Sequence, residues 1–201
     1  MSIMSLLYKR RINVGFKKFV DTNCVTKDFP KKGVNFIDIF PIIKRRGLKE
    51  LNEVMTFPEA IILIPEARGF LFAGELDWNK IVPLRKKGKL PGEVMEIKYE
   101  KEYGSDSLFF QIECIRDILW KTEWDKSIPV PVCFFDDVLA TGGTAEAVTK
   151  FFNELNIEGY TFNVVSNKFY IEILDLKGKE RLRNLKQRNG ESLKVESVYE
   201  Y

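Results

Sequence analysis

Two adjacent aspartates, Asp136 and Asp137, stand between an apolar run and a glycine-rich loop in the stretch VCFFDDVLATGGTAEA. The glycines Gly142 and Gly143 let the backbone approach a ligand closely, and amide groups at the start of a helix favour an anion such as phosphate. The two carboxylates favour hydroxyl donors or a cation instead. A sugar phosphate meets both preferences, because its phosphate can bind the glycine turn while its hydroxyls donate hydrogen bonds to the aspartates. Mg²⁺ bound to such a ligand would strengthen the same arrangement.

Other interpretations of this stretch are weaker. A nucleotide-triphosphate loop of the form GxxxxGK[ST] needs a lysine that ATGGT lacks, and the dinucleotide fingerprint GxGxxG is also missing here. An aspartate pair alone, or a glycine pair alone, is more often an ordinary turn and helix-start signal. Both together, after a buried strand and before a helix, favour a ligand site. Because the chain has no histidine, serine–histidine hydrolysis, HExxH metalloprotease chemistry and histidine phosphotransfer are excluded.

The composition indicates one soluble domain. The 201 residues are 45% hydrophobic, which suffices for a substantial core. A net charge of +3, from 32 basic and 29 acidic residues, is far below the balance of a dedicated nucleic-acid binder. The cysteines Cys24, Cys114 and Cys133 are too scattered for a zinc site or a disulfide framework, so a reducing, cytoplasmic setting fits best. The sequence has neither a secretory signal nor an apolar run of about 18 residues, so no membrane contact is expected.

The pattern of apolar residues predicts how the aspartates and the loop are positioned. A continuous apolar run at Glu59–Glu66 (EAIILIPE) predicts a strand buried on both faces, and ARGFLFAGEL predicts a short helix after Gly69. The same order recurs at Pro129–Phe135, followed by a helix that begins near Thr144, and GYTFNVVSN predicts a further strand. Such a βαβ order predicts an α/β fold, with a mainly parallel sheet flanked by helices. We place both aspartates at the carboxyl edge of their strand rather than within it, because there both can reach a ligand crevice.

Three further segments have recognisable patterns. Alternation in MEIKY and in LFFQI predicts a β-hairpin closed by YGSD. The segment Arg85–Lys89 (RKKGK) has glycine and proline around it and no helical period, which predicts a mobile cationic loop. In the basic C-terminal stretch KGKERLRNLKQR, Leu182 and Leu185, together with the preceding Leu176, fit one face of a helix whose charged face is solvated.

Together these motifs resemble a known family. FFDDVLATGGT is similar to the 5-phosphoribosyl 1-pyrophosphate (PRPP) signature of the type I phosphoribosyltransferases, and its ATGGT ending is typical of the adenine phosphoribosyltransferases. Further segments match that family in the same order: FPKKGVNFIDIFPII, PEARGFLFAG, VPLRKKGKLPG, YEKEYGSDSL and EILDLKGKERL. The resemblance runs from Phe29 to Leu182, and ordered motifs are far more specific than any one alone.

The resemblance implies a single type I phosphoribosyltransferase domain over residues 1–201, with a small hood from about residues 29–43 and a flexible catalytic β-hairpin loop from about residues 85–108. The family transfers the ribose phosphate of PRPP to N9 of a purine and releases pyrophosphate, with Mg²⁺ bound to the donor. The implied reaction is therefore adenine plus PRPP to AMP plus pyrophosphate, a step of purine salvage. The implied setting is a cytoplasmic homodimer whose partners are these small molecules, with neither nucleic acid nor membrane.

The functional residues of the family carry over onto matching positions. The resemblance implies catalytic roles for Asp136, Asp137, Glu102 and Tyr103. Asp136 and Asp137 match the carboxylates that hold the ribose hydroxyls, and they are the protein contacts for Mg²⁺, which PRPP itself mainly holds. Glu102 matches the glutamate near N7 of the purine, and Tyr103 matches a tyrosine that helps to cover the site.

Three groups of binding residues follow from the same resemblance. The loop for the 5′-phosphate of PRPP corresponds to Ala140, Thr141, Gly142, Gly143 and Thr144. The pyrophosphate contacts correspond to Arg68, Gly69, Arg85, Lys86 and Lys89. The base contacts correspond to Val34, Phe36 and Ile37, with Phe36 as the aromatic that stacks on the base.

The chain also departs from the family pattern. Ile37 stands where arginine is usual, and Lys32 stands where a second proline is frequent. The segment GELDWNKIVPL is shorter than usual, whereas CIRDILWKTEWDKSIP is longer and adds Trp120 and Trp124. Two alternatives therefore stay open: transfer to another purine such as hypoxanthine, guanine or xanthine, or a PRPP-binding regulator without catalysis. The retained KEYG and RKKGKLPG favour catalysis, because a regulator does not need a loop that serves the leaving group and the base.

Overall fold

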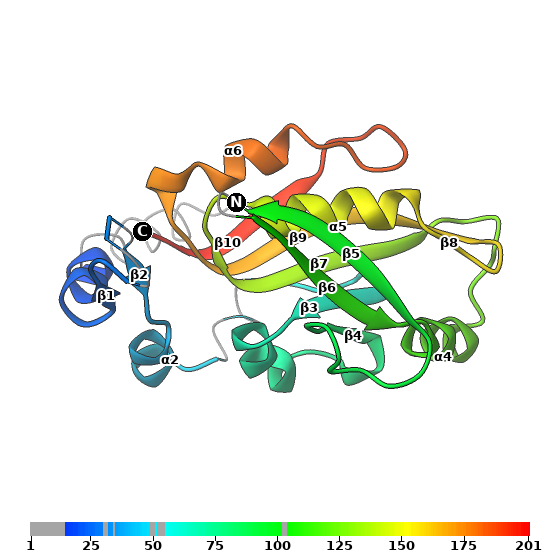
Figure 1. The fold of residues 1–201 in the computed structure, drawn as a ribbon, viewed down its shortest axis with the longest axis horizontal. Helices are drawn as coiled ribbons and strands as arrows, with labels where there is room; N and C mark the ends of the chain where they lie inside the picture. Colours follow the sequence, from blue (N-terminus) through cyan, green and yellow to red (C-terminus); the bar gives the residue numbers. More distant parts are fainter. Residues whose placement is uncertain (1–14, 30–31, 34, 49–50, 52–54, 102–103) are drawn as a thin grey trace.

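A mainly parallel sheet forms the centre of the computed structural model, which describes all residues except 1–14, 30–31, 34, 49–50, 52–54 and 102–103 (Figure 1). In spatial order its strands are β10 (Lys194–Glu200), β9 (Tyr160–Glu172), β7 (Val130–Leu139), β3 (Ile61–Pro65) and β4 (Ile81–Leu84). Each neighbouring pair in this order is parallel, and the short β8 (Asn156–Ile157) pairs antiparallel with β9. The predicted α/β fold with a mainly parallel sheet is confirmed.

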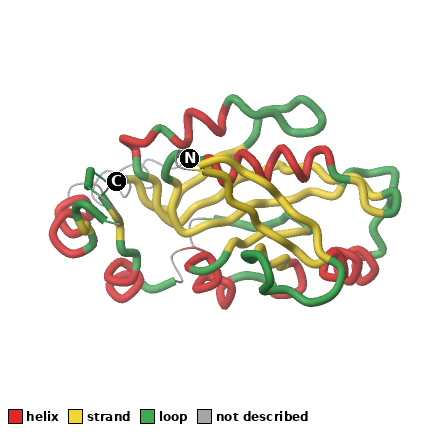
Figure 2. The backbone as a smooth tube through the Cα atoms, in the orientation of Figure 1, coloured by secondary structure: helices red, strands yellow, loops and turns green. Residues whose placement is uncertain are grey.

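The sheet is buried on both faces, because its apolar side chains alternate between two hydrophobic clusters. In β3, Ile61 and Leu63 belong to the first cluster, whereas Ile62 and Ile64 belong to the second. Figure 2 shows helices on either side of the strands. The first cluster includes side chains from α4 (Ile112–Thr122) and α5 (Gly143–Glu154), and the second includes side chains from η1 (Arg68–Glu75), α2 (Phe40–Arg46) and the helix over residues 15–23.

A β-hairpin lies over the same face as α5 and runs from α4 toward the carboxyl ends of the central strands (Figure 1). It consists of β5 (Val94–Lys101) and β6 (Gly104–Gln111), paired from Val94↔Gln111 to Lys101↔Gly104. The predicted hairpin is confirmed, and its alternating apolar side chains are buried at Ile97, Tyr99, Leu108 and Phe110. The last three residues of the predicted turn YGSD belong to β6, which begins at Gly104.

A small antiparallel pair lies at the end of the molecule to which the carboxyl ends of the central strands point (Figure 1). It joins β1 (Val25–Thr26) to β2 (Phe36–Ile37) and is followed by α2. Ile37, Ile39 and Ile42 are buried in the second cluster, which attaches this part to the sheet. Of these elements, β2 and the start of α2 fall within the segment of about residues 29–43 for which we predict the hood, whereas β1 precedes it.

Two sequence-based expectations about element boundaries were wrong. The strand β7 does not end before the aspartates but continues to Leu139, because β9 remains beside it as a pairing partner up to Leu139↔Glu172. The C-terminal basic stretch is not one helix: η3 (Leu174–Leu176) is followed by the short α6 (Gly178–Arg183). Of the three leucines that fit one helix face, only Leu182 is fully buried. Lys177, with φ 54° in the left-handed region, separates η3 from α6.

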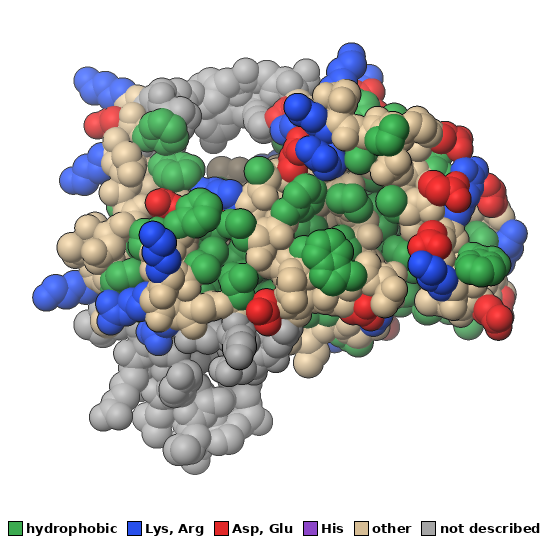
Figure 3. Space-filling view, turned by 90° about the horizontal axis from the view of Figure 1, so that it is seen from below, with side chains coloured by type: hydrophobic (Ala, Val, Ile, Leu, Met, Phe, Trp, Pro, Cys, Tyr) green, Lys and Arg blue, Asp and Glu red, His purple; other side chains and the backbone are tan. Residues whose placement is uncertain are grey.

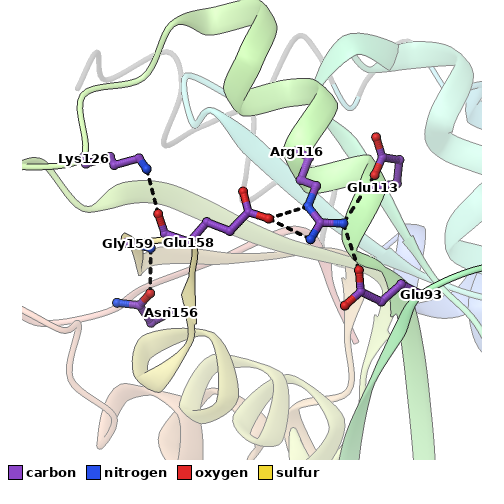
Figure 4. A network of polar contacts seen from close by, with 7 residues as sticks. All are labelled: Glu93, Glu113, Arg116, Lys126, Asn156, Glu158 and Gly159. Atoms are coloured by element: carbon purple, nitrogen blue, oxygen red, sulfur yellow. Dashed lines mark hydrogen bonds and ion pairs between the residues drawn. The ribbon is translucent and has the colours of Figure 1, made fainter.

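The long connection that carries Trp120 and Trp124 begins at the base of the hairpin. Arg116 of α4 binds Glu93, just before β5, with 2.9 Å between Nη1 and Oε2, and Glu158, in the β8–β9 turn, with 2.7 Å between Nη2 and Oε1 (Figure 4). Trp120 is 78% exposed, whereas Trp124 packs partly against the first cluster. The added segment therefore packs beside the hairpin base and the β8–β9 turn. Of the helices described, none has both the length and the hydropathy needed to span a membrane.

Candidate active site

The aspartate pair lies where β7 extends beyond its neighbour β3. The two strands pair only as far as Leu63↔Phe134, so the next residues of β7 have no strand partner on that side. Asp137 is 4% exposed, and Oδ1 of Asp136 accepts a hydrogen bond of 2.8 Å from the backbone N–H of Asp137. Burial and the charge of Asp137 raise the pKa of Asp136 well above its ordinary value of 3.8.

Arg68, at the start of η1, joins this pair to the small antiparallel strands. Its Nε lies 2.7 Å from Oδ2 of Asp137, an ion pair on a carboxylate that is almost fully buried. Its Nη1 donates a hydrogen bond of 3.3 Å to the backbone oxygen of Ile37, and its guanidinium carbon lies 5.0 Å from the ring centroid of Phe36. One side chain thus contacts both the carboxylate predicted to bind ribose and the residues predicted to bind the base.

Gly69 permits this close packing of η1 on the sheet. A Cβ atom at this position would lie 2.9 Å from Cγ2 of Ile64 and 3.4 Å from Oδ1 of Asp136. The first of these distances is shorter than real Cβ contacts, so any larger residue would push η1 away from β7. The glycine therefore sets how closely Arg68 and the aspartates approach each other.

Glu66, the residue directly after β3, binds the start of the cationic segment that follows β4. Its Oε2 accepts a hydrogen bond of 2.7 Å from Nε of Arg85, and its Oε1 accepts one of 2.6 Å from the backbone N–H of Lys86. Burial alone would raise the pKa of Glu66, but the hydrogen bonds from Lys86 and Arg85 lower it below its ordinary value of 4.5. The carboxylate is therefore kept ionised beside the two cations.

The side chain of Lys86 continues this network into the hairpin. Its Nζ lies 2.5 Å from Oδ2 of Asp106 and 3.0 Å from the hydroxyl oxygen of Tyr99. Arg85 also pairs with β6, since its backbone exchanges two hydrogen bonds with Phe109. Lys89 is exposed, and its backbone N–H closes a turn on the oxygen of Lys86. The start of the cationic segment is thus held by defined contacts, and its mobility stays a prediction.

The glycine-rich loop connects β7 to α5 and presents the amino end of that helix. Gly142, with φ 80°, is the residue before the helix, and Gly143 is its first residue. A positive φ at Gly142 is readily adopted only by glycine, and the amides of the first turn have no partner within the helix itself. The predicted loop and helix start are confirmed, and the arrangement suits an anion.

No family model matches the sequence. Curated relatives do match: the adenine phosphoribosyltransferase of Clostridium botulinum is 41% identical over 163 residues, 77% of this chain and 86% of the relative. That of Clostridium kluyveri is 34% identical over 168 residues, 79% of this chain and 88% of the relative. The chain belongs to the adenine phosphoribosyltransferase family. Among solved structures of the family, the Thermoanaerobacter pseudethanolicus protein aligns with a TM-score of 0.63 at 31% identity, covering 92% of this chain and 99% of that one. The Saccharomyces cerevisiae protein, solved in a complex that includes adenine, aligns with a TM-score of 0.58 at 28% identity, covering 92% and 98%.

In this member of the adenine phosphoribosyltransferase family, the structure brings some of the predicted site residues into contact in two groups. Direct contacts join Arg68 to Asp137, Phe36 and Ile37, and Gly69 packs beside Asp136. Arg85 and Lys86 form a second group around Glu66. Val34, Glu102 and Tyr103 lie outside the described residues, so their positions in the site stay predictions.

Sequence reasoning missed three polar side chains of this phosphoribosyltransferase site. Glu66 contacts both predicted pyrophosphate cations, Arg85 and Lys86, whereas Tyr99 and Asp106 contact Lys86. Glu66 could have been found, because it directly follows a buried strand at the carboxyl edge of the sheet, where ligands of such folds bind. Tyr99 and Asp106 gave no comparable signal, because they follow the ordinary alternation of the hairpin.

Replacing Glu66 by alanine is expected to raise the KM for PRPP about tenfold, the effect of losing about one hydrogen bond to a charged group, while the KM for adenine stays unchanged. The reason is that Arg85 and Lys86 would lose the acceptor that fixes them at the end of β4. Initial rates of AMP formation at varied PRPP and varied adenine would measure both constants. Glu66→Gln, which keeps an acceptor for Lys86 N–H but loses the charge, should give an intermediate KM. A lower melting temperature with unaltered kinetics would show that Glu66 is only structural.

Proposed function

We propose that this chain transfers the 5-phosphoribosyl group of PRPP to adenine. The bond between C1 of the ribose and the pyrophosphate oxygen breaks, a bond from C1 to N9 of adenine forms, and adenine loses its N9 proton, which yields AMP and pyrophosphate. The observation that carries the proposal is the contact of Arg68 with Asp137, Phe36 and Ile37, because it unites the proposed ribose, pyrophosphate and base contacts in one place. The family relationship supports the same reaction.

The ribose end of the donor is assigned to β7 and the loop after it. Asp136 and Asp137 accept hydrogen bonds from the ribose hydroxyls, and the amides from Ala140 to Thr144 bind the 5′-phosphate. The position of the glycine loop at the amino end of α5 supports this assignment, because the helix dipole and free amides favour an anion there.

The pyrophosphate end is assigned to Arg68, Gly69, Arg85, Lys86 and Lys89. Breaking the bond at C1 builds negative charge on pyrophosphate and positive charge on the ribose ring, and cations already in place stabilise the first. The network around Glu66 supports this role, since it holds Arg85 and Lys86 before any substrate binds. Closure of the hairpin would exclude water, which competes with adenine as the nucleophile.

Mg²⁺ fits this site as a companion of the donor rather than as an ion held by the protein alone. The described residues contain no cluster of three or more carboxylate, cysteine or histidine side chains that could bind a metal. Magnesium commonly binds through one or two carboxylates together with substrate phosphates. We therefore assign most of its ligands to PRPP oxygens, with Asp136 and Asp137 as the protein contacts. When bound, it neutralises charge on the leaving pyrophosphate.

The base is assigned to the segment around β2. Phe36 stacks on the purine, the backbone from Val34 to Ile37 contacts its edge, and Glu102 and Tyr103 act at N7 and over the site. Phe36 is half-buried, so part of its ring stays exposed, and the guanidinium of Arg68 beside the ring connects this segment to Asp137. Since backbone atoms contact the edge, the substitution of isoleucine at position 37 is compatible with adenine.

We also propose that the working form is a cytoplasmic homodimer. Hydrophobic side chains gather on the face shown in Figure 3, which carries α2, η1 and η2 (Trp78–Lys80). Phe40 is 48% exposed, Leu71 38% and Trp78 67%, and such neighbouring apolar groups on several elements favour a protein contact. A second copy of the chain would bury them.

A panel of bases tests the proposed function. With PRPP and Mg²⁺ present, adenine is expected to release pyrophosphate with a kcat/KM about 10⁴-fold above that for hypoxanthine or guanine, because a site built for one hydrogen-bonding pattern leaves polar groups unpaired with another. Xanthine completes the panel. Release with hypoxanthine or guanine but not with adenine would contradict the proposal. Binding of PRPP without turnover of any base would favour a regulator instead.

A further inference from the structure

The start of α6 packs directly against the glycine-rich loop. A Cβ atom built on Gly178 would lie 2.2 Å from the backbone oxygen of Ala140 and 2.8 Å from Cδ1 of Leu139. From the other side, a Cβ atom on Gly142 would lie 3.1 Å from the backbone oxygen of Gly178. The backbones of the loop and of α6 are therefore in contact. A Cβ atom only 2.2 Å from a backbone oxygen is a clash that turning a side chain cannot relieve.

Three contacts hold α6 in this position. Nζ of Lys179 lies 2.9 Å from Oε2 of Glu172, at the end of β9, whose side chain is only 3% exposed. Arg181 forms an ion pair with Glu146 in the first turn of α5. Leu182 is fully buried in the first hydrophobic cluster. The segment is thus fixed to the end of β9 and to the start of α5, the helix that follows the glycine-rich loop.

We propose that Gly178 is a positioning residue for the 5′-phosphate loop, acting through the backbone of Ala140 and Gly142; this inference rests on the proposed function. A loop with two successive glycines has much conformational freedom, so its amides need support from outside to keep one geometry. The segment Gly178–Leu182 provides that support because its first residue packs against the loop. It also gives a role to the motif EILDLKGKERL, to which the reaction itself assigns no contact.

If Gly178 positions this loop, its replacement should change the affinity for some ligands and not for others. The segment Gly178–Leu182 contacts the loop assigned to the 5′-phosphate. The pyrophosphate contacts assigned to Arg68, Arg85 and Lys86 are instead held by η1 and by the segment after β4. Moving the loop should therefore weaken ligands that carry a 5′-phosphate. Pyrophosphate, which does not use the loop, should bind as before.

The experiment compares two glycine-to-alanine variants by calorimetric titration with AMP, ribose 5-phosphate and Mg-pyrophosphate. Gly178→Ala is expected to weaken AMP and ribose 5-phosphate about 10²-fold, the cost of a displacement near 1 Å, and to leave pyrophosphate unchanged. Gly74→Ala, where a Cβ atom meets nothing within 4 Å, is the matched control and should bind all three ligands normally. Equal losses for all three ligands in Gly178→Ala, or normal AMP binding, would overturn the proposal.

A second variant covers the case in which Gly178→Ala does not fold. Lys179→Met removes the ion pair with Glu172 without adding a clash, so it should weaken AMP and ribose 5-phosphate in the same direction by a smaller factor. Unchanged affinities in this variant would contradict the role of α6 as a support. Failure of the unmodified chain to bind either 5′-phosphate ligand would contradict the proposed function itself, which separates the two ideas.

Discussion

Replacing Asp136 and Asp137 together by asparagine is expected to lower the kcat/KM for AMP formation by at least about 10²- to 10³-fold, the loss typical of removing one preplaced electrostatic contact in an active site. The amides can still meet ribose hydroxyls, but they carry no charge to balance the oxocarbenium character of the ribose or to contact Mg²⁺. Steady-state rates of AMP formation at saturating Mg²⁺ would measure the change. Near-normal kcat/KM would refute the assignment of the pair.

The same variant should remain folded in the absence of substrate. Because burial and Asp137 raise the pKa of Asp136, folding stability falls as the pH rises from the ordinary value of 3.8 through the raised pKa of the folded state. The asparagine variant lacks the titrating carboxyl group of Asp136. Its melting temperature should therefore rise relative to that of the unmodified chain as the pH increases over that range. Asp117→Asn, on the exposed side of α4, is the control and should change neither activity nor this pH dependence.

Replacing Arg68 by alanine is expected to lower kcat/KM by about 10²- to 10³-fold, since it removes a cation placed where charge develops on pyrophosphate. Pyrophosphate affinity should fall as well, which titration of Mg-pyrophosphate would measure. The buried carboxylate of Asp137 would lose its ion-pair partner at 2.7 Å, so we also expect a lower melting temperature.

Two further variants test this interpretation. Arg68→Lys keeps the charge but not the planar guanidinium that contacts Asp137, Ile37 and the Phe36 ring together, so it should recover only part of the activity. Arg45→Ala removes another arginine that stacks on a phenylalanine, 4.6 Å from the Phe19 ring centroid, and should leave the kinetics unchanged. If Arg68→Ala turned over like the unmodified chain, the proposed pyrophosphate contact would be wrong.

The sequence carried the information that is local along the chain. The continuous apolar run at Glu59–Glu66 predicted the buried strand β3, and the order of strand, glycine loop and helix predicted the parallel sheet and α5, because each pattern depends on neighbours within a few residues. The sequence pattern was misleading for the C-terminal stretch, where the spacing of three leucines predicted one face of a single helix. There the chain instead breaks at Lys177, and Gly178 packs on a distant loop. This break in the helix depends on a tertiary contact, which leaves no periodic pattern in the sequence.

By itself, the sequence determined the chemistry of the two ends of the donor site: carboxylates at Asp136 and Asp137, and an anion loop at Gly142 and Gly143. Those groups are adjacent in the chain, so residue type and order were enough. Only the tertiary structure decided that Arg68 contacts Ile37, 31 residues away, and that Glu66 holds the backbone of Lys86, 20 residues away. The physical reason is that these contacts join loops at the ends of different elements, and strand order and packing, rather than any local pattern, decide which loops meet.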